Sequence, residues 1–116
     1  MKILIADDNA GIREMLKLVL QSLGHEVVGE ADNGEAAIKA FRELRPEVVM
    51  LDIIMPGKTG LAALDEIRAL DPAAKVVMLT AVDQDDVNLR VADKGAVMIY
   101  KPFSSLDIEK AFNRLK

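Results

Sequence analysis

Five polar side chains that could take part in chemistry stand directly after short apolar runs: Asp7, Asp8, Asp52, Thr80 and Lys101. Three of them are carboxylates, one is a hydroxyl and one is an ammonium. If the apolar runs are strands of a parallel sheet, their C-terminal ends meet at one edge, where open α/β sheets bind ligands. We therefore expect these five side chains to converge on one site, with Asp52 as the reactive group.

Clustered carboxylates favour binding of a cation. Two carboxylates about 5 Å apart repel each other by roughly 3 kcal/mol at an effective dielectric constant of about 20. Mg²⁺ relieves this repulsion and accepts oxygen ligands, bound waters and a phosphate oxygen. A carboxylate such as Asp52 can attack phosphorus and form an acyl phosphate. Lys101 would neutralise the phosphoryl oxygens together with the cation, and Thr80 would donate a hydrogen bond to one of them.

The rest of the chain predicts the elements that position these groups. Apolar runs alternate with segments of helical periodicity, and each connection is short, which is typical of a doubly wound parallel sheet with helices on both faces. The predicted strands are Ile3–Ala6, Val27–Val28, Val48–Asp52, Val76–Leu79 and Val97–Tyr100. Five helices are predicted, covering residues 12–23, 34–44, 61–70, 83–94 and 105–115. The second strand is the least apolar, so we place it at an edge of the sheet, and the helix over 83–94 has a thin apolar face.

Particular residues mark where these helices begin and end. Gly24 is in the position after a helix C-cap, and Asn33 is an N-cap candidate. Ser104 with Asp107 three residues later predicts a capping box. Gly57 and Gly60 are interpreted as turn formers.

Composition excludes several classes of protein. The chain has 116 residues, 51% of them hydrophobic, which fits one folded domain. It has no cysteine and one histidine, His25, so disulfide scaffolds, thiol nucleophiles and histidine-rich metal sites are excluded. A net charge of −4 argues against direct nucleic-acid binding. No apolar run is long enough for membrane insertion or a signal peptide, so we expect a cytoplasmic protein.

Four motifs occur in order along the chain: Asp7-Asp8, the segment LDIIMPGKTG that contains Asp52, Thr80-Ala81 and Lys101-Pro102-Phe103. Together they resemble the response-regulator receiver family, including the single-domain regulators of chemotaxis and of the sporulation phosphorelay. The resemblance implies a flavodoxin-like sheet of order 2-1-3-4-5. It also implies a single receiver domain over residues 1–116, and we expect no output domain.

The resemblance also implies roles for individual residues. Asp52 resembles the phosphoacceptor and Asp8 the direct Mg²⁺ ligand, with Asp7 holding metal-bound waters. The backbone carbonyl of Ile54 matches a further metal ligand. Thr80 and Lys101 resemble the residues that contact the phosphoryl group and change position on activation.

A role in two-component signalling follows from the same resemblance. The phosphoryl donor would be a phosphohistidine on a sensor histidine kinase or a histidine phosphotransfer protein. The fourth helix, fifth strand and fifth helix would form a face that binds or releases a downstream protein target. Such a protein is a phosphoacceptor that assists its own phosphorylation and dephosphorylation, and it is not an enzyme in the usual sense.

A departure from the family pattern affects the predicted switch. The family usually has an aromatic residue three positions before its lysine, where this chain has Met98, while Tyr100 is adjacent to Lys101. Both Met98 and Tyr100 therefore remain candidates for the switch residue.

The residues that flank the site predict the lifetime of the phosphorylated form. Ile54 and Val82, two residues beyond Asp52 and Thr80 respectively, are aliphatic and cannot orient an attacking water, which predicts slow hydrolysis of the phosphorylated form.

Two alternatives come from other functional classes. One is a non-phosphorylated or redesigned receiver-like module that acts only by protein interaction. The other is a phosphatase or flavin-type doubly wound protein. Against the latter, no glycine-rich loop follows the first strand, and Ile54 stands where a second acid would be needed.

Overall fold

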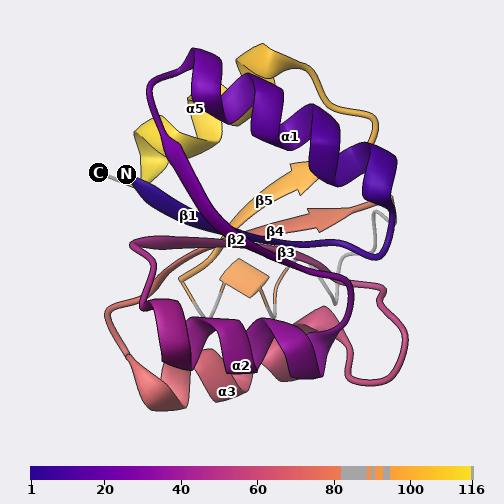
Figure 1. The fold of residues 1–116 in the computed structure, drawn as a ribbon, viewed down its shortest axis with the longest axis vertical. Coiled ribbons are helices and arrows are strands. Elements are labelled where there is room, and N and C mark those ends of the chain that lie inside the picture. The colour runs from indigo at the N-terminus through magenta and orange to yellow at the C-terminus, as the bar shows by residue number, and fades with distance from the viewer. Residues whose placement is uncertain (82–88, 90, 93–94, 116) are drawn as a thin grey trace.

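A parallel five-stranded sheet forms the centre of the computed structural model, which describes residues 1–81, 89, 91–92 and 95–115 (Figure 1). The strands are β1 (Lys2–Ala6), β2 (Glu26–Ala31), β3 (Val48–Asp52), β4 (Lys75–Thr80) and β5 (Val97–Tyr100). The helices with described bounds are α1 (Ala10–Ser22), α2 (Gly34–Leu44), α3 (Gly60–Leu70) and α5 (Ser105–Arg114). The strand order is β2-β1-β3-β4-β5, as predicted.

The helices cover both faces of the sheet, with α1 and α5 on one face and α2 and α3 on the other (Figure 1). This arrangement confirms the doubly wound, flavodoxin-like fold. The helix predicted over residues 83–94 lies mostly outside the described residues. Of the three described positions within it, Val91 is buried and Leu89 is exposed, in agreement with the predicted apolar stripe.

The position of each strand in the sheet follows from its apolar content. All five residues of β3 are buried, because β3 lies between β1 and β4 and is covered by helices on both faces. The less apolar β2 lies at the edge, as predicted. Its pairing with β1 is irregular: Ile3 pairs with Val27, but Leu4 pairs with Gly29, so that Val28 is an extra residue.

Alternation along the strands divides the core into two layers, because neighbouring strand residues point to opposite faces. On the α2/α3 face, strand residues pack against Ile38, Phe41, Leu64 and Ile67. On the α1/α5 face, the others pack against Leu16, Leu20, Ile108 and Phe112. Burial of each such side chain contributes about 1.5–3 kcal/mol to folding. The two layers together bury both faces of the sheet.

Helix caps fix the loops at that edge. The side chain of Asn9 accepts a hydrogen bond from the Ile12 amide, so α1 begins immediately after the Asp7-Asp8 pair. Asn33 caps α2, and Ser104 with Asp107 forms the predicted capping box of α5. At the other edge of the sheet, between α1 and β2, Gly24 has a φ of 87°, which favours glycine.

Among the described residues, no helix has the length and apolar character needed to cross a membrane.

Candidate functional site

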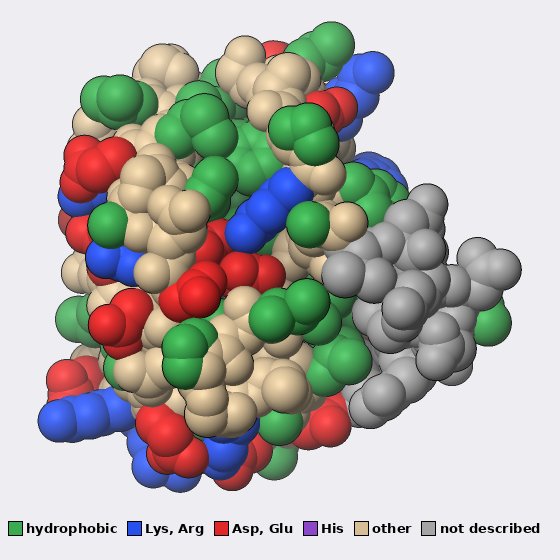
Figure 2. All heavy atoms as spheres, turned by 90° about the vertical axis from the view of Figure 1, so that its right-hand side faces the viewer, with side chains coloured by type: hydrophobic (Ala, Val, Ile, Leu, Met, Phe, Trp, Pro, Cys, Tyr) green, Lys and Arg blue, Asp and Glu red, His purple; other side chains and the backbone are tan. Residues whose placement is uncertain are grey.

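The predicted site residues do converge at the C-terminal edge of the sheet. In the face that looks onto this edge, acidic side chains gather beside a basic side chain near the middle (Figure 2). Asp7, Asp52 and Thr80 are the buried polar or charged residues among those the structure describes. Since burying such groups costs free energy unless they are paired, their gathering at one place marks a candidate functional site.

The three carboxylates form an acidic cluster, defined here as Asp7, Asp8 and Asp52. One carboxylate oxygen can be taken from each of the three residues so that all three oxygens lie within 4.8 Å of one another. The cluster forms because β1 and β3 are neighbours, with Ala6 paired to Leu51 one step before the acids. Asp7 is fully buried, whereas Asp8 is exposed. A hard divalent cation prefers this set of oxygen donors, so the acidic cluster is compatible with a divalent metal.

Lys101 directly follows β5, the outer strand on the other side of β4, and its side chain reaches the acidic cluster along the C-terminal edge of the sheet. Its Nζ lies 2.7 Å from Asp7 Oδ2 and 3.2 Å from Asp52 Oδ2. Its amide donates to the Thr80 carbonyl at 2.7 Å, and the peptide that follows it, to Pro102, is cis. Burial alone would lower the pKa of Lys101. The hydrogen bond to Asp7 and the charges of Asp52 and Asp7 outweigh burial and raise this pKa, so the ammonium stays charged at neutral pH.

Asp52 combines burial with a charged environment. Burial is the main cause that raises the pKa of its carboxyl, and the negative charge of Asp7 adds to it. Lys101 and a hydrogen bond from the Ile54 amide, 3.2 Å from Oδ1, oppose this rise. Asp52 is therefore less stabilised as an anion than an exposed aspartate, which leaves it dependent on nearby cations.

The loop between β3 and α3 is held tightly against the acceptor strand. The Ile53 amide donates to the Leu79 carbonyl, and the Gly60 amide donates to the Ile53 carbonyl at 2.8 Å. Gly57 has a φ of 72°, as expected of a turn former. Gly60 is a glycine for another reason, because a Cβ there would collide with the Asp52 carbonyl. The side chain of Ile54 is exposed beside the site.

The two switch candidates differ in their surroundings. Thr80 is buried at the end of β4 and pairs in register with Tyr100. Tyr100 is 42% exposed, whereas Met98 is partly buried and packs against the α2/α3 layer of the core. Val82, which the sequence also places near the site, lies outside the described residues.

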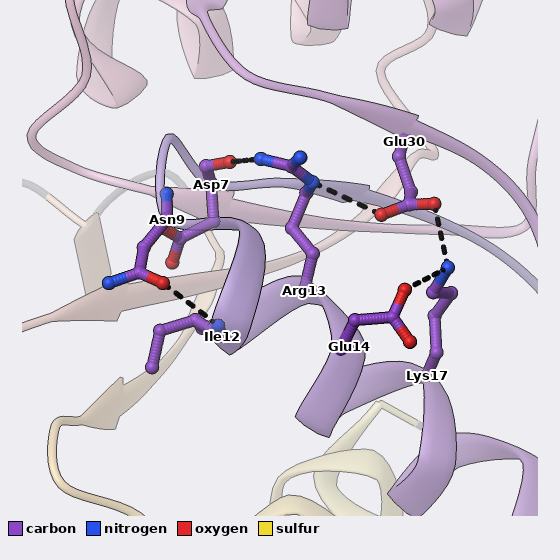
Figure 3. Close-up of polar contacts among 7 residues, drawn as sticks. All are labelled: Asp7, Asn9, Ile12, Arg13, Glu14, Lys17 and Glu30. Carbon is purple, nitrogen blue, oxygen red and sulfur yellow. Dashed lines mark hydrogen bonds and ion pairs between the residues drawn. The ribbon is translucent and has the colours of Figure 1, made fainter.

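Sequence analysis missed Arg13, which lies on α1 beside the acidic cluster (Figure 3). Its Nη1 donates to the Asp7 carbonyl at 2.7 Å, and its Nε lies 3.1 Å from Glu30 on β2. The only signal in the sequence is an arginine four residues after the cap Asn9. This spacing places Arg13 on the first turns of α1 but does not show which strand it reaches.

The comparisons with known proteins agree with this arrangement. The family model of the response regulator receiver domain matches residues 3–113. The chain belongs to the response-regulator receiver family. It is therefore a receiver domain of two-component signal transduction, and phosphoryl transfer is typical of that family.

Chemotaxis proteins from two bacteria match this receiver domain over nearly their whole length. It is 38% identical to the chemotaxis protein CheY of Thermotoga maritima, over 98% of this chain and 96% of the relative. It is 41% identical to CheY of Listeria monocytogenes, over 98% of this chain and 97% of the relative. A solved complex of CheX and CheY with BeF3 and Mg²⁺ from Borrelia burgdorferi superposes with a TM-score of 0.93 at 27% identity, covering 97% of this chain and 86% of that one.

Family membership favours the receiver interpretation over a phosphatase or flavin-type protein. The CheY of Borrelia burgdorferi was solved in complex with a partner protein, CheX.

Proposed function

We propose that this receiver domain accepts a phosphoryl group on Asp52 from a phosphohistidine of a sensor histidine kinase or a histidine phosphotransfer protein. One observation carries the proposal: the buried Asp52 carboxylate lies 3.2 Å from the Lys101 ammonium and within 4.8 Å of Asp7 and Asp8. A carboxylate with a raised pKa in a charged pocket is a candidate nucleophile.

In the proposed transfer, a carboxylate oxygen of Asp52 attacks phosphorus. The new P–O bond forms as the bond between phosphorus and the donor's imidazole nitrogen breaks, and the bonding electrons leave with that nitrogen. The Lys101 ammonium neutralises charge on the phosphoryl oxygens. The Thr80 hydroxyl, at the end of the adjacent strand β4, donates a hydrogen bond to one of them.

Mg²⁺ is the proposed cofactor. The donor set fits, because every candidate ligand is a hard oxygen: the carboxylates of Asp7, Asp8 and Asp52 and the carbonyl of Ile54. When bound, Mg²⁺ would neutralise charge on the phosphoryl oxygens. The exposed position of Asp8 suits direct ligation, whereas the buried Asp7 already contacts Lys101 and suits hydrogen bonds to metal-bound water. The Borrelia CheY solved with BeF3 and Mg²⁺ supports this choice of metal.

Phosphorylation is proposed to switch a face formed by the segment before β5, β5 itself and α5, which binds or releases a downstream protein. Tyr100 is the stronger switch candidate, since it pairs in register with Thr80 and is partly exposed. Met98 occupies the position three residues before Lys101 and is partly buried against the α2/α3 layer of the core, and Tyr100 would take its place in the switch only if β5 shifts. We assign residues 1–116 to one receiver domain of a cytoplasmic protein. It takes part in phosphoryl transfer and assists its own phosphorylation and dephosphorylation, without being an enzyme in the usual sense.

The test is phosphorylation by acetyl phosphate with and without Mg²⁺, followed by intact mass. We expect one added phosphoryl group on wild type that depends on Mg²⁺ and is absent in Asp52→Asn. Asp32→Asn, which removes an exposed carboxylate outside the acidic cluster, is the matched control and should be phosphorylated normally. Absence of an adduct on wild type under every condition would favour a receiver-like module that acts only by protein interaction.

A further inference from the structure

The acidic cluster depends on one short corner of the chain, where β1 ends and α1 begins. Asp7 and Asp8 are consecutive there, so the peptide that joins them sets the relative positions of two of the three carboxylates. The Asp7 amide donates to the Ala31 carbonyl at 3.0 Å, and the Asn9 amide donates to Asp7 Oδ1 at 2.9 Å. The carbonyl of the Asp7–Asp8 peptide needs a donor of its own.

Arg13 supplies that donor. Its Nη1 lies 2.7 Å from the Asp7 carbonyl, which is the oxygen of the Asp7–Asp8 peptide. Figure 3 shows the side chain of Arg13 extending from α1 between this carbonyl and Glu30. A hydrogen bond from a charged guanidinium is stronger than one between neutral groups.

The guanidinium is itself fixed from a second direction. Its Nε lies 3.1 Å from Glu30 Oε1, and its side chain is only 20% exposed. Glu30 is held in turn by Lys17, whose Nζ lies 3.0 Å from Oε2 and 2.7 Å from Glu14 (Figure 3). The hydrogen bond from Lys17 is the main cause that lowers the pKa of Glu30, so this carboxylate stays ionised.

We infer that Arg13 is a positioning residue for the acidic cluster: it fixes the peptide that joins Asp7 to Asp8 and thereby sets how tightly the cluster binds a divalent cation. The inference rests on the proposed Mg²⁺ site. A planar guanidinium can donate to the carbonyl and to Glu30 at once, whereas a lysine ammonium is a single point of charge. The rest of β1 and α1 is held by the core, so the expected effect of losing Arg13 is local.

The test compares Arg13→Met with Lys17→Met. Lys17→Met is the control, because Lys17 is a cation on the same helix that pairs with the same partner, Glu30. The hydrogen bond to the Asp7 carbonyl comes from Arg13 and not from Lys17. Mg²⁺ alone is titrated into each variant, and the dissociation constant is followed by NMR of the Asp8 amide. Melting temperature and hydrogen exchange at the Asn9 amide are measured without metal.

We expect Arg13→Met to weaken Mg²⁺ binding about tenfold, as is typical when an outer partner of a metal ligand is lost. Lys17→Met should leave the dissociation constant within about twofold of wild type, at a similar melting temperature. Exchange at the Asn9 amide should accelerate in Arg13→Met alone. Equal dissociation constants in both variants would overturn the inference, because Arg13 would then only support the fold.

Two further variants complete the test. Arg13→Lys should bind Mg²⁺ with an affinity between those of wild type and Arg13→Met, and full wild-type affinity would refute the two-point contact. If Arg13→Met does not fold, Glu30→Gln releases one side of the guanidinium and should weaken Mg²⁺ binding to a smaller extent. Unchanged Mg²⁺ binding would contradict the inference.

Failure of wild type to bind Mg²⁺ would refute the proposed metal site instead. Exchange at the Asn9 amide would still report whether Arg13 fixes the corner between β1 and α1.

Discussion

Asp52→Asn is expected to make the metal-free protein more stable, although it removes a hydrogen-bonded side chain. The ionised Asp52 is repelled by Asp7 at no more than 4.8 Å, which amounts to about 3.5 kcal/mol at an effective dielectric constant of 20. Lys101 at 3.2 Å attracts it by about 5 kcal/mol on the same scale, and the exposed Asp8 adds a weaker repulsion. These charge terms nearly cancel, so the cost of burying the carboxylate decides the sign.

The expected gain is on the order of 1 kcal/mol, or about 3–6 °C in melting temperature for a chain of this length. Asparagine keeps the shape and one oxygen acceptor, which can accept from the Ile54 amide. The oxygen that accepts from Lys101 is replaced by an amide nitrogen, and Lys101 keeps its hydrogen bond to Asp7. Thermal unfolding followed by circular dichroism, in EDTA at pH 7.5, measures the difference.

The pH dependence of this gain supplies the control. Because the pKa of Asp52 is raised in the folded state, ionisation begins to destabilise the fold as the pH rises above the usual pKa of 3.8, and the destabilisation is complete above the raised pKa. The difference between Asp52→Asn and wild type should therefore be full at neutral pH and disappear as the pH falls toward 3.8, the usual value. A lower melting temperature for the variant at pH 7.5, or a gain that persists below pH 4, would refute the reasoning.

Three further outcomes are expected. Millimolar Mg²⁺ should raise the melting temperature of wild type, because a free Mg²⁺ concentration of one hundred times the dissociation constant adds about 2.7 kcal/mol to the free energy of unfolding. An unchanged melting temperature would mean that the acidic cluster does not bind Mg²⁺. Gly60→Ala should cost about 1–3 kcal/mol in urea denaturation because its methyl group meets the Asp52 carbonyl, and a neutral result would contradict that close approach. The phosphorylated form should persist for minutes or longer, because the side chain of Ile54 offers no group to orient water. Intact mass over time measures the loss of the phosphoryl group, and decay within seconds would contradict this expectation.

The sequence predicts which charged side chains come together because each of them follows an apolar run. In a parallel sheet the ends of such runs meet at one edge, so Asp7, Asp52 and Lys101 are brought together by topology alone. Helix caps such as Asn33 are equally local, since the capping side chain and the amide it accepts lie three residues apart.

Contacts between distant elements are not predictable in this way. Whether Arg13 reaches β2 depends on the distance between α1 and the edge strand, and on the direction in which Glu30 points. The close approach of Gly60 to the Asp52 backbone likewise depends on how α3 sits on the sheet, so the same glycine is interpreted as a turn former from the sequence.

The irregular pairing of β2 with β1 changes the face to which the later residues of β2 point. Val27 packs on the α1/α5 face, and a regular strand would place Glu30, three residues later, on the opposite face. The extra residue, Val28, restores Glu30 to the side of α1, where it meets Arg13. A version of β2 that is shorter by this one residue would still pair Glu30 with Ile5. Loss of this residue from the edge strand would thus leave the corner that carries Asp7 and Asp8 with the same neighbours, which separates the length of β2 from the geometry of the acidic cluster.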